Sequence, residues 1–568
     1  AAVARYQVPA PGLKTADQLF IGAPFALSPD GSRLAYVANV NSAEPVLMLR
    51  NQGDITAHQV AGTEGADNPF FSPDGEWIAY VAHQKLYKVS VDRGAPVELA
   101  QAQPVFAPGG TWRGNGTIIF NSGPTHLLSV PSEGGPVDTV ATMEPLTYAA
   151  FPATVPGTDV VLVTECSNNC AHMDVAAYNL RNRQRKLLLP NTARAWVLPG
   201  NLLIAVRVDG TVVGGELDPA ALTLSGDPVP LLNDVAMAAG VTPEMSVSGN
   251  GTLVYLPRAG ASDDVTPVRV DRAGRVSALD PAWHDYLQYP SLSPDGRQLA
   301  VNILTQGRMD IWVKQLPAGP LTRLTFDGVL NYRPAWTPDG RSFSYSSDRD
   351  GLTHLFLLRG DGSSQPERLM PYDTTQVDES LWSHDGKWLI YRAGVVNGKR
   401  DIYARAATGD TTRLTISASA NFDEYTPALS PDGRWLAYVS DESGREQVFV
   451  RPFPDAGRSR LQVSTAGGTQ PAWSHDGREL FFVSASDSLV AVDVSGSSAS
   501  GFRPGVHRAL FSLQAGHIAT LAFHRSYEVT PNDQGFIMLQ ATGATRNTDS
   551  NLTIVLNWLD EVRRQVRR

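Results

Sequence analysis

The chain has 568 residues, 50 glycines, 40 prolines and a formal net charge of −10. This length exceeds what one hydrophobic core usually serves, so two or more domains are expected. The Lys and Arg residues are scattered and form no basic stripe, which argues against nucleic-acid binding. No apolar run reaches the roughly 18 residues that a membrane-spanning helix needs. Glycine and proline spread along the whole chain indicate short strands joined by tight turns.

A short strand is predicted near the start of the chain, over Arg5, Tyr6, Gln7 and Val8. Two partners are open to it. It either closes a ring of strands within this chain or pairs with a neighbouring chain, because an unpaired strand edge accepts either partner.

A four-residue phrase, Ser or Thr followed by Pro or His, Asp and Gly, returns many times along the chain. The Asp-Gly pair predicts a tight turn, in which glycine adopts positive φ and aspartate accepts backbone hydrogen bonds. An apolar run such as Leu34–Val37 follows each turn and predicts a strand. A bulky apolar residue, for example Trp336 or Trp473, precedes it. The clearest copies place the turn aspartate at Asp30, Asp74, Asp295, Asp339, Asp385, Asp432 and Asp476.

Weaker copies around residues 115, 157, 200, 250 and 532 complete a series of twelve, about 46 residues apart. This period fits four strands of about five or six residues, which make one propeller blade. Because propellers typically hold four to eight blades, twelve blades divide into two rings. The predicted fold class is all-β, with two β-propellers in tandem and six four-stranded blades in each. The first propeller is assigned to 1–262 and the second to 263–568, with a boundary at Gly260–Asp264.

The two cysteines, Cys166 and Cys170, are separated by three polar residues in the first propeller. We predict a disulfide, which implies an oxidising compartment outside the cytoplasm. Two free surface thiols are the alternative. A zinc site is less favoured, because two thiolates and the nearby His172 make an incomplete ligand set.

A closing strand is predicted at the end of the chain, over Thr553, Ile554, Val555 and Leu556. We expect it to join the last blade of the second propeller, or to pair between chains. The final run, 558–568, forms either a short basic amphipathic helix that contacts a partner or a solvated tail beside the last blade.

The repeated phrase resembles the WD40-like PD40 repeat of TolB-type β-propellers, together with the hairpin Asp348-Arg349-Asp350-Gly351 and the Arg-Leu-Thr strand endings. The order of features also resembles the tandem propeller region of bacterial membrane-bound Ser/Thr protein kinases. The residues that carry this second resemblance are Val268–Arg275, Tyr438–Gly444, Val450–Pro454 and Leu552–Trp558. No kinase glycine-rich loop or His-Arg-Asp motif is present, so kinase activity is not implied.

We assign the repeated aspartates to turn formation and name no catalytic, metal-binding or cofactor-binding residue. Calcium at one or two of the turns stays open. His384 and His475 stand where sibling repeats have proline and are interpreted as turn residues. Histidines distant in sequence can still meet over a propeller channel, as in metal-dependent lyases of similar fold. No Gly-x-Ser-x-Gly elbow or phosphate-binding glycine motif is present.

The resemblance and the repeats together predict a non-enzymatic binding or scaffold module outside the cytoplasm, periplasmic, cell-surface or secreted, similar to a sensor ectodomain. Its partners would be a protein, peptide or glycan on the propeller faces. An alternative is a self-assembling extracellular subunit that exchanges its terminal strands between chains. A propeller lyase or hydrolase is the third hypothesis.

Overall fold

The computed structural model describes most of the chain, in a series of segments. The described residues are 3–13, 23–39, 44–92, 94–102, 109–123, 125–144, 147–167, 170, 172–238, 242–257, 265–280, 282–285, 287–305, 308–370, 376–394, 400–408, 412–419, 421–455, 457, 460–495, 502–521, 524–541 and 549–566. Over these segments, no helix has the length and apolar character to cross a membrane.

The contacts divide the chain into two units. The first unit is Ala1–Ser262 together with Arg546–Arg568, and the second is Asp263–Thr545. The prediction that 263–568 forms one propeller is therefore wrong at its C-terminal end, because the last 23 residues belong to the first unit. The predicted boundary residues Gly260–Asp264 lie outside the described residues.

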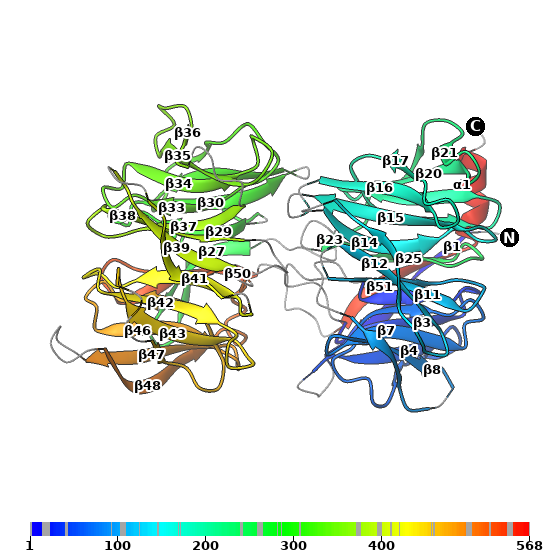
Figure 1. Ribbon diagram of the computed structural model, residues 1–568, viewed down its shortest axis with the longest axis horizontal. Coiled ribbons are helices and arrows are strands. Elements are labelled where there is room, and N and C mark those ends of the chain that lie inside the picture. The colour runs from blue at the N-terminus through cyan, green and yellow to red at the C-terminus, as the bar shows by residue number, and fades with distance from the viewer. Residues whose placement is uncertain are drawn as a thin grey trace. The chain divides into compact units, whose positions relative to one another are not determined.

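The first unit is a ring of six antiparallel sheets (Figure 1). Blade 5 has a fifth strand beside the expected four, because both β21 and β22 pair with β20. The strands are, for blade 1, β2 (Phe25–Leu27), β3 (Arg33–Ala38), β4 (Val46–Asn51) and β5 (His58–Gln59); for blade 2, β6 (Asp67–Phe71), β7 (Trp77–Ala82), β8 (Lys85–Ser90) and β9 (Val97–Gln101); for blade 3, β10 (Gly110–Trp112), β11 (Thr117–Ser122), β12 (His126–Pro131) and β13 (Asp138–Thr142); for blade 4, β14 (Thr147–Thr154), β15 (Val160–Ser167), β16 (His172–Asn179) and β17 (Arg185–Leu189); for blade 5, β18 (Thr192–Leu198), β19 (Leu202–Arg207), β20 (Val212–Asp218), β21 (Thr223–Leu224) and β22 (Val229–Leu232); for blade 6, β25 (Met245–Val247), β26 (Leu253–Tyr255), β51 (Asp549–Leu556) and β1 (Ala4–Pro11); the short pair β23 (Met237–Ala238) and β24 (Thr242–Pro243) precedes blade 6.

The second unit repeats this plan with six four-stranded sheets (Figure 1). Its strands are, for blade 1, β29 (Leu287–Leu292), β30 (Gln298–Thr305), β31 (Arg308–Gln315) and β32 (Leu321–Arg323); for blade 2, β33 (Asn331–Trp336), β34 (Ser342–Ser347), β35 (His354–Arg359) and β36 (Glu367–Arg368); for blade 3, β37 (Val377–Trp382), β38 (Trp388–Ala393), β39 (Asp401–Ala406) and β40 (Leu414–Ser417); for blade 4, β41 (Glu424–Leu429), β42 (Trp435–Ser440), β43 (Gln447–Pro452) and β44 (Leu461–Gln462); for blade 5, β45 (Gly468–Trp473), β46 (Glu479–Ser484), β47 (Ser488–Ser495) and β48 (Arg503–Ser512); for blade 6, β49 (Glu528–Val529), β50 (Gly535–Ala541), β27 (Val265–Asp271) and β28 (Val276–Ala278). The protein is thus all-β, with two β-propellers in tandem.

The first strand of each blade lies innermost, since these strands contact one another in sequence around each ring. In the second unit β29 contacts both β33 and β49, which closes the circle. Tryptophans of the column before the turn join neighbouring blades. The indole Nε1 of Trp336 donates to the carbonyl of Ser291 at 3.0 Å, and that of Trp473 donates to the carbonyl of Ala428 at 3.0 Å. The bulky residue predicted to feed the core therefore also holds one blade to the one before it.

The two terminal strands close the first ring by pairing with each other. In blade 6, β51 lies between β1 and β26, with Arg5 opposite Val555 and Val8 opposite Leu552. The expectation that the end strand joins the last blade of the second propeller is wrong. The second ring instead closes through β27 and β50, where Val268 pairs with Met538. Each ring thereby closes through a blade that pairs an early strand of its unit with a late one.

The chain ends in the amphipathic helix α1 (Trp558–Val566), drawn in red in Figure 1. Trp558, Leu559 and Val562 are buried against the core of the first unit, next to β20 and β22. The Leu559 side chain lies directly against Gly251, where an added Cβ would clash with it. The interpretation as a solvated tail beside the last blade is therefore wrong, because the apolar face of the helix covers a blade of the first unit.

Candidate functional site

The repeated aspartates hold the turns between the first and second strands of their blades. In all seven clear copies the Ser or Thr hydroxyl donates to the aspartate Oδ1 at 2.5–2.7 Å. The amide two residues on donates to the same oxygen at 2.9–3.1 Å. The bonds from Ser383 and Lys387 lower the pKa of Asp385 to about 2. The aspartates thus accept hydrogen bonds inside their own turns.

A second repeated position, not recognised from the sequence, lies four residues before the first residue of each turn. Here the innermost strand bulges, and the residue adopts positive φ at Tyr289, Arg333, Thr426 and Gln470, each followed by proline. A bulge re-aims one side chain, and proline at this point costs no ladder hydrogen bond. In the second unit the six residues at this position are Tyr289, Arg333, Glu379, Thr426, Gln470 and Ser526.

All six of these side chains are polar, and all are at most 5% exposed. We call them, with Tyr332, Asp378 and His524, the channel cluster of the second unit. A conventional core would place apolar residues here, because buried polar groups cost free energy unless they are fully hydrogen-bonded. A polar residue therefore stands at this position in every blade of the ring, although packing alone would favour an apolar one.

Arg333 lies at the centre of one half of this cluster. Its guanidinium lies over the rings of Tyr289 and Tyr332, 5.2 Å from each centroid, and donates to the carbonyl of Asp378 at 3.0 Å. The Tyr332 hydroxyl donates to Asp378 Oδ1 at 2.7 Å. Burial raises the pKa of Asp378 and raises that of Tyr332 well above the ordinary value. The Nε of Arg333 is buried and has no hydrogen-bond partner among the described residues.

His524 lies in the other half and bridges the ring. Its Nδ1 lies 2.7 Å from Glu379 Oε1, and its ring meets that of Tyr289 edge-on at 4.8 Å. Burial lowers the pKa of His524, although Glu379 acts to raise it. Burial also acts to raise the pKa of Glu379, but His524 and Arg333 outweigh this and lower it. His524 and Glu379 thus share a hydrogen bond in a buried setting, where burial and the ion pair act in opposite directions on the pKa of the imidazole.

The histidines interpreted as turn residues do not join this cluster. His475 stands in its turn, where its backbone amide and Nδ1 lie 2.8 and 2.9 Å from Asp533 Oδ1 of the next blade. Within the described parts of the chain, no group of three or more His, Cys, Asp or Glu side chains is arranged to hold a metal ion.

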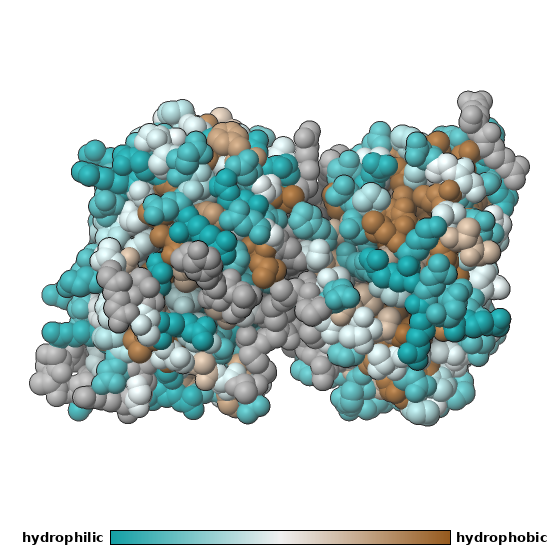
Figure 2. All heavy atoms as spheres, turned by 45° about the horizontal axis from the view of Figure 1, so that its top comes forward, coloured by the Kyte–Doolittle hydropathy of each residue, from teal (hydrophilic) through white to brown (hydrophobic). Residues whose placement is uncertain are grey.

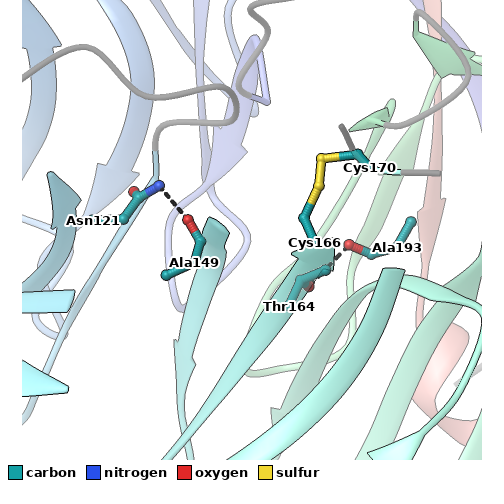
Figure 3. The surroundings of a disulfide bond; sticks show 6 residues. All are labelled: Asn121, Ala149, Thr164, Cys166, Cys170 and Ala193. Atoms are coloured by element: carbon teal, nitrogen blue, oxygen red, sulfur yellow. Dashed lines mark hydrogen bonds between the residues drawn. A yellow bond between two sulfur atoms is a disulfide. The ribbon is translucent and has the colours of Figure 1, made fainter. Parts of the chain in front are cut away.

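The two cysteines form a disulfide in the first unit, with their Cα atoms 4.6 Å apart. Cys166 is at the end of β15 and is fully buried, and Cys170 is 6% exposed. Figure 3 shows the bond beside Thr164, whose hydroxyl donates to the carbonyl of Ala193 on the next inner strand at 3.0 Å. A similar tie runs from Asn121 to the carbonyl of Ala149, one blade earlier. The disulfide therefore closes a hairpin that is anchored to an inner strand.

On the face seen in Figure 2, hydrophilic residues spread over both units, with hydrophobic residues in patches between them. A polar pocket of about 340 Å³ lies between blades 3 and 4 of the first unit, lined by Arg113, Asp138 and Arg183 among others. Arg113 is already paired with Asp159 at 2.7 Å.

Comparison with known families identifies part of the second ring. Residues 281–396, which run from before β29 to beyond β38, match the family described as the TolB beta propeller domain. Residues 281–396 are therefore similar to a TolB-type β-propeller domain. The match covers the first two of the six blades of the second unit and two strands of the third, and the other blades repeat the same four-stranded arrangement.

Relatives of the chain include an uncharacterised protein of Agrobacterium fabrum, 26% identical over 34% of this chain and 68% of that protein. The uncharacterised peptidase YuxL of Bacillus subtilis is 24% identical over 33% of this chain and 33% of its own length. Among solved structures, one described as a putative TolB from Agrobacterium tumefaciens is 20% identical, with a TM-score of 0.37, over 49% of this chain and 97% of that chain. The match thus spans about two thirds of the first relative and one third of the second.

Proposed function

We propose that the chain is a non-enzymatic binding module outside the cytoplasm, which takes up its ligand at the channel cluster of the second unit. The observation that carries this proposal is the polar side chain at the channel position of all six blades, from Tyr289 to Ser526, where packing alone favours apolar residues. Buried polar networks that weaken a core are commonly found where a protein recognises a ligand.

The cluster offers a specific set of contacts. The aromatic faces of Tyr289 and Tyr332 flank the guanidinium of Arg333, whose Nε has no hydrogen-bond partner among the described residues. The hydroxyl of Thr426 is buried and likewise without a described partner. Tyrosine and arginine supply much of the binding energy at recognition surfaces. These groups suit a peptide segment of a protein partner, since they combine ring faces with directed donors.

The location outside the cytoplasm rests on the disulfide between Cys166 and Cys170, since such bonds persist in oxidising compartments. The resemblance to the propeller regions of membrane-bound kinases supports a sensor role for the module. The terminal strands proposed for exchange between chains pair within one chain here, Arg5 with Val555 among them. Self-association therefore stays a prediction.

Selection of a random peptide library against the immobilised chain tests the proposed site. Peptides that survive should bind the Arg333→Met variant at least tenfold more weakly than the unchanged chain, because the central cation and its donors are lost. Arg297→Met, which removes an exposed arginine from a turn of the same unit, is the matched control and should bind normally. Peptides that bind the Arg333 variant with unchanged affinity would contradict the proposed site.

A further inference from the structure

The first unit has its own ring of channel positions, four residues before each turn, with a different composition. These residues are Pro24, Asn68, Gly109, Phe151, Arg194 and Glu244. Only one of them, Arg194, carries a positive charge. Phe151 and Asn68 adopt the same positive φ as their counterparts in the second unit, so the bulged register is shared.

Arg194 is a cation without a counterion in the described structure. Its guanidinium lies over the ring of Phe151 at 5.0 Å and over that of Trp196 at 4.7 Å. Its Nη1 is buried and has no hydrogen-bond partner among the described residues, which also form no ion pair with it. Burial lowers the pKa of Arg194 to about 10, so the group stays charged at neutral pH. A cation held among ring faces without a counterion destabilises a fold unless a ligand supplies the anion.

Asn68 provides a second unmatched group at the same level of the ring. It lies on blade 2, three blades away from Arg194 on blade 5, and these two blades face each other across a six-membered ring. The side chain is 3% exposed, and neither Nδ2 nor Oδ1 has a hydrogen-bond partner among the described residues. Glu244, on the neighbouring blade 6, has a partner of its own.

The inner strand that carries Arg194 is hydrogen-bonded to the strand that holds one cysteine of the disulfide. Thr164 donates to the carbonyl of Ala193, the residue before Arg194, and Cys166 follows two residues further along β15 (Figure 3). A donor held in place by its supporting groups binds a ligand at lower entropic cost than a mobile one.

We propose that Arg194, framed by Phe151 and Trp196, binds the carboxylate group of an organic anion in the channel of the first unit. Ring faces cover the guanidinium, but Arg194 as a whole is only half-buried, so a ligand reaches the part of its edge that stays exposed. A planar carboxylate matches this edge with two parallel hydrogen bonds, and its single negative charge balances the single cation. The site lies in the other unit and stands whether or not the channel cluster of the second unit binds a ligand.

Thermal unfolding and hydrogen–deuterium exchange of the full chain test this site at pH 7. Sodium acetate, compared with sodium chloride at equal ionic strength, should raise the unfolding temperature in a saturable way and slow exchange in β14 and β18. Arg194→Met should abolish both effects. Arg194→Lys, which keeps the charge but loses the planar fork, should need at least tenfold more acetate. Equal acetate responses in the unchanged chain and Arg194→Met would overturn the proposal.

The variant also separates ligand binding from a purely structural role. In chloride alone, Arg194→Met should unfold at the same or a higher temperature, because a half-buried cation without a counterion is removed. A lower unfolding temperature, together with no acetate response in the unchanged chain, would show that the ring contacts are structural and would overturn the site.

Two further probes identify the source of the carboxylate. N-acetyl-trialanine should bind as the free acid and not as the C-terminal amide, and equal binding of the two would contradict carboxylate recognition. Tighter binding of the free acid than of acetate assigns the site to a peptide terminus, and equal binding assigns it to small carboxylates. Stabilisation by inorganic phosphate with no effect of acetate would also overturn the proposal.

Discussion

His524 and Glu379 form a hydrogen bond of 2.7 Å although 145 residues separate them in the sequence. Glu379 belongs to blade 3 of the second unit, and His524 lies just before the inner strand of blade 6. Because three blades separate these two in a ring of six, the bond connects opposite sides of the ring. The bond therefore forms only when the ring is closed, as does the pairing of β27 with β50.

Removing the histidine should destabilise the second unit. His524→Leu leaves the Glu379 carboxylate buried without its donor, at a cost of about 3 kcal/mol in the free energy of unfolding. Combining it with Glu379→Gln should recover part of this loss, which a double-mutant cycle in urea measures. His284→Leu, at an exposed histidine of the same unit, is the control. Strictly additive effects of the two substitutions would show that the pair is not coupled.

The pH dependence of the second unit should contain a contribution from Glu424. This carboxyl is 3% exposed, and burial raises its pKa to about 8. A pKa raised in the folded state gives stability that is complete below the unfolded value near 4.5 and is lost as pH rises through 8. Glu424→Gln should therefore stabilise the chain at pH 8 by an amount on the order of a few kcal/mol and leave it unchanged near pH 4.

Denaturant unfolding at several pH values between 4 and 9 measures this difference. Glu367→Gln, at an exposed glutamate on β36, is the matched control and should leave the profile unaltered. A Glu424→Gln profile parallel to that of the unchanged chain across this range would refute the assignment.

Much of the fold follows from residues that are visible in the sequence. The Asp-Gly turns and the column that includes Trp336 and Trp473 suffice to predict the blades, because each is a local signal repeated at a fixed period. The partner of the end strand was not predictable in this way. Thr553 and its neighbours form a generic apolar strand, and the choice between two rings depends on contacts some 300 residues apart in the sequence, such as Leu253 with Val555.

The channel positions could have been found from a local signal that was overlooked. The pairs Asn68-Pro69, Tyr289-Pro290, Arg333-Pro334 and Gln470-Pro471 all stand four residues before a turn serine or threonine. A proline at a fixed place in a strand indicates a bulge or an edge. The partners of these residues are another matter, since the contact of His524 with Glu379 depends on ring closure and leaves no trace in sequence spacing.

The end strand should support the first unit alone. Leu552 is fully buried on β51, so Leu552→Asp places an unpaired charge in blade 6 and should increase hydrogen exchange throughout the first unit. Asn551→Asp, at the exposed neighbouring position, is the control. Exchange measured by mass spectrometry should stay unchanged in 265–541. Increased exchange in that range instead would place the strand in the second ring.

The disulfide should stabilise the first unit by a modest amount. A bond that closes so short a loop removes chain entropy worth about 2 kcal/mol from the unfolded state. Replacing Cys166 and Cys170 together by Ser should lower the unfolding free energy by that amount, measured in urea. A reducing agent should have the same effect on the unchanged chain and none on the double variant. If reduction leaves the unfolding free energy of the unchanged chain the same, a structural role for the bond is contradicted.

A structure of the full chain bound to a selected peptide tests the proposed function most directly. The peptide should lie over the channel cluster of the second unit, with an acceptor within hydrogen-bond distance of Arg333 and a side chain against the ring of Tyr289 or Tyr332. A peptide bound along an outer blade edge, with the channel cluster untouched, would contradict the proposed function.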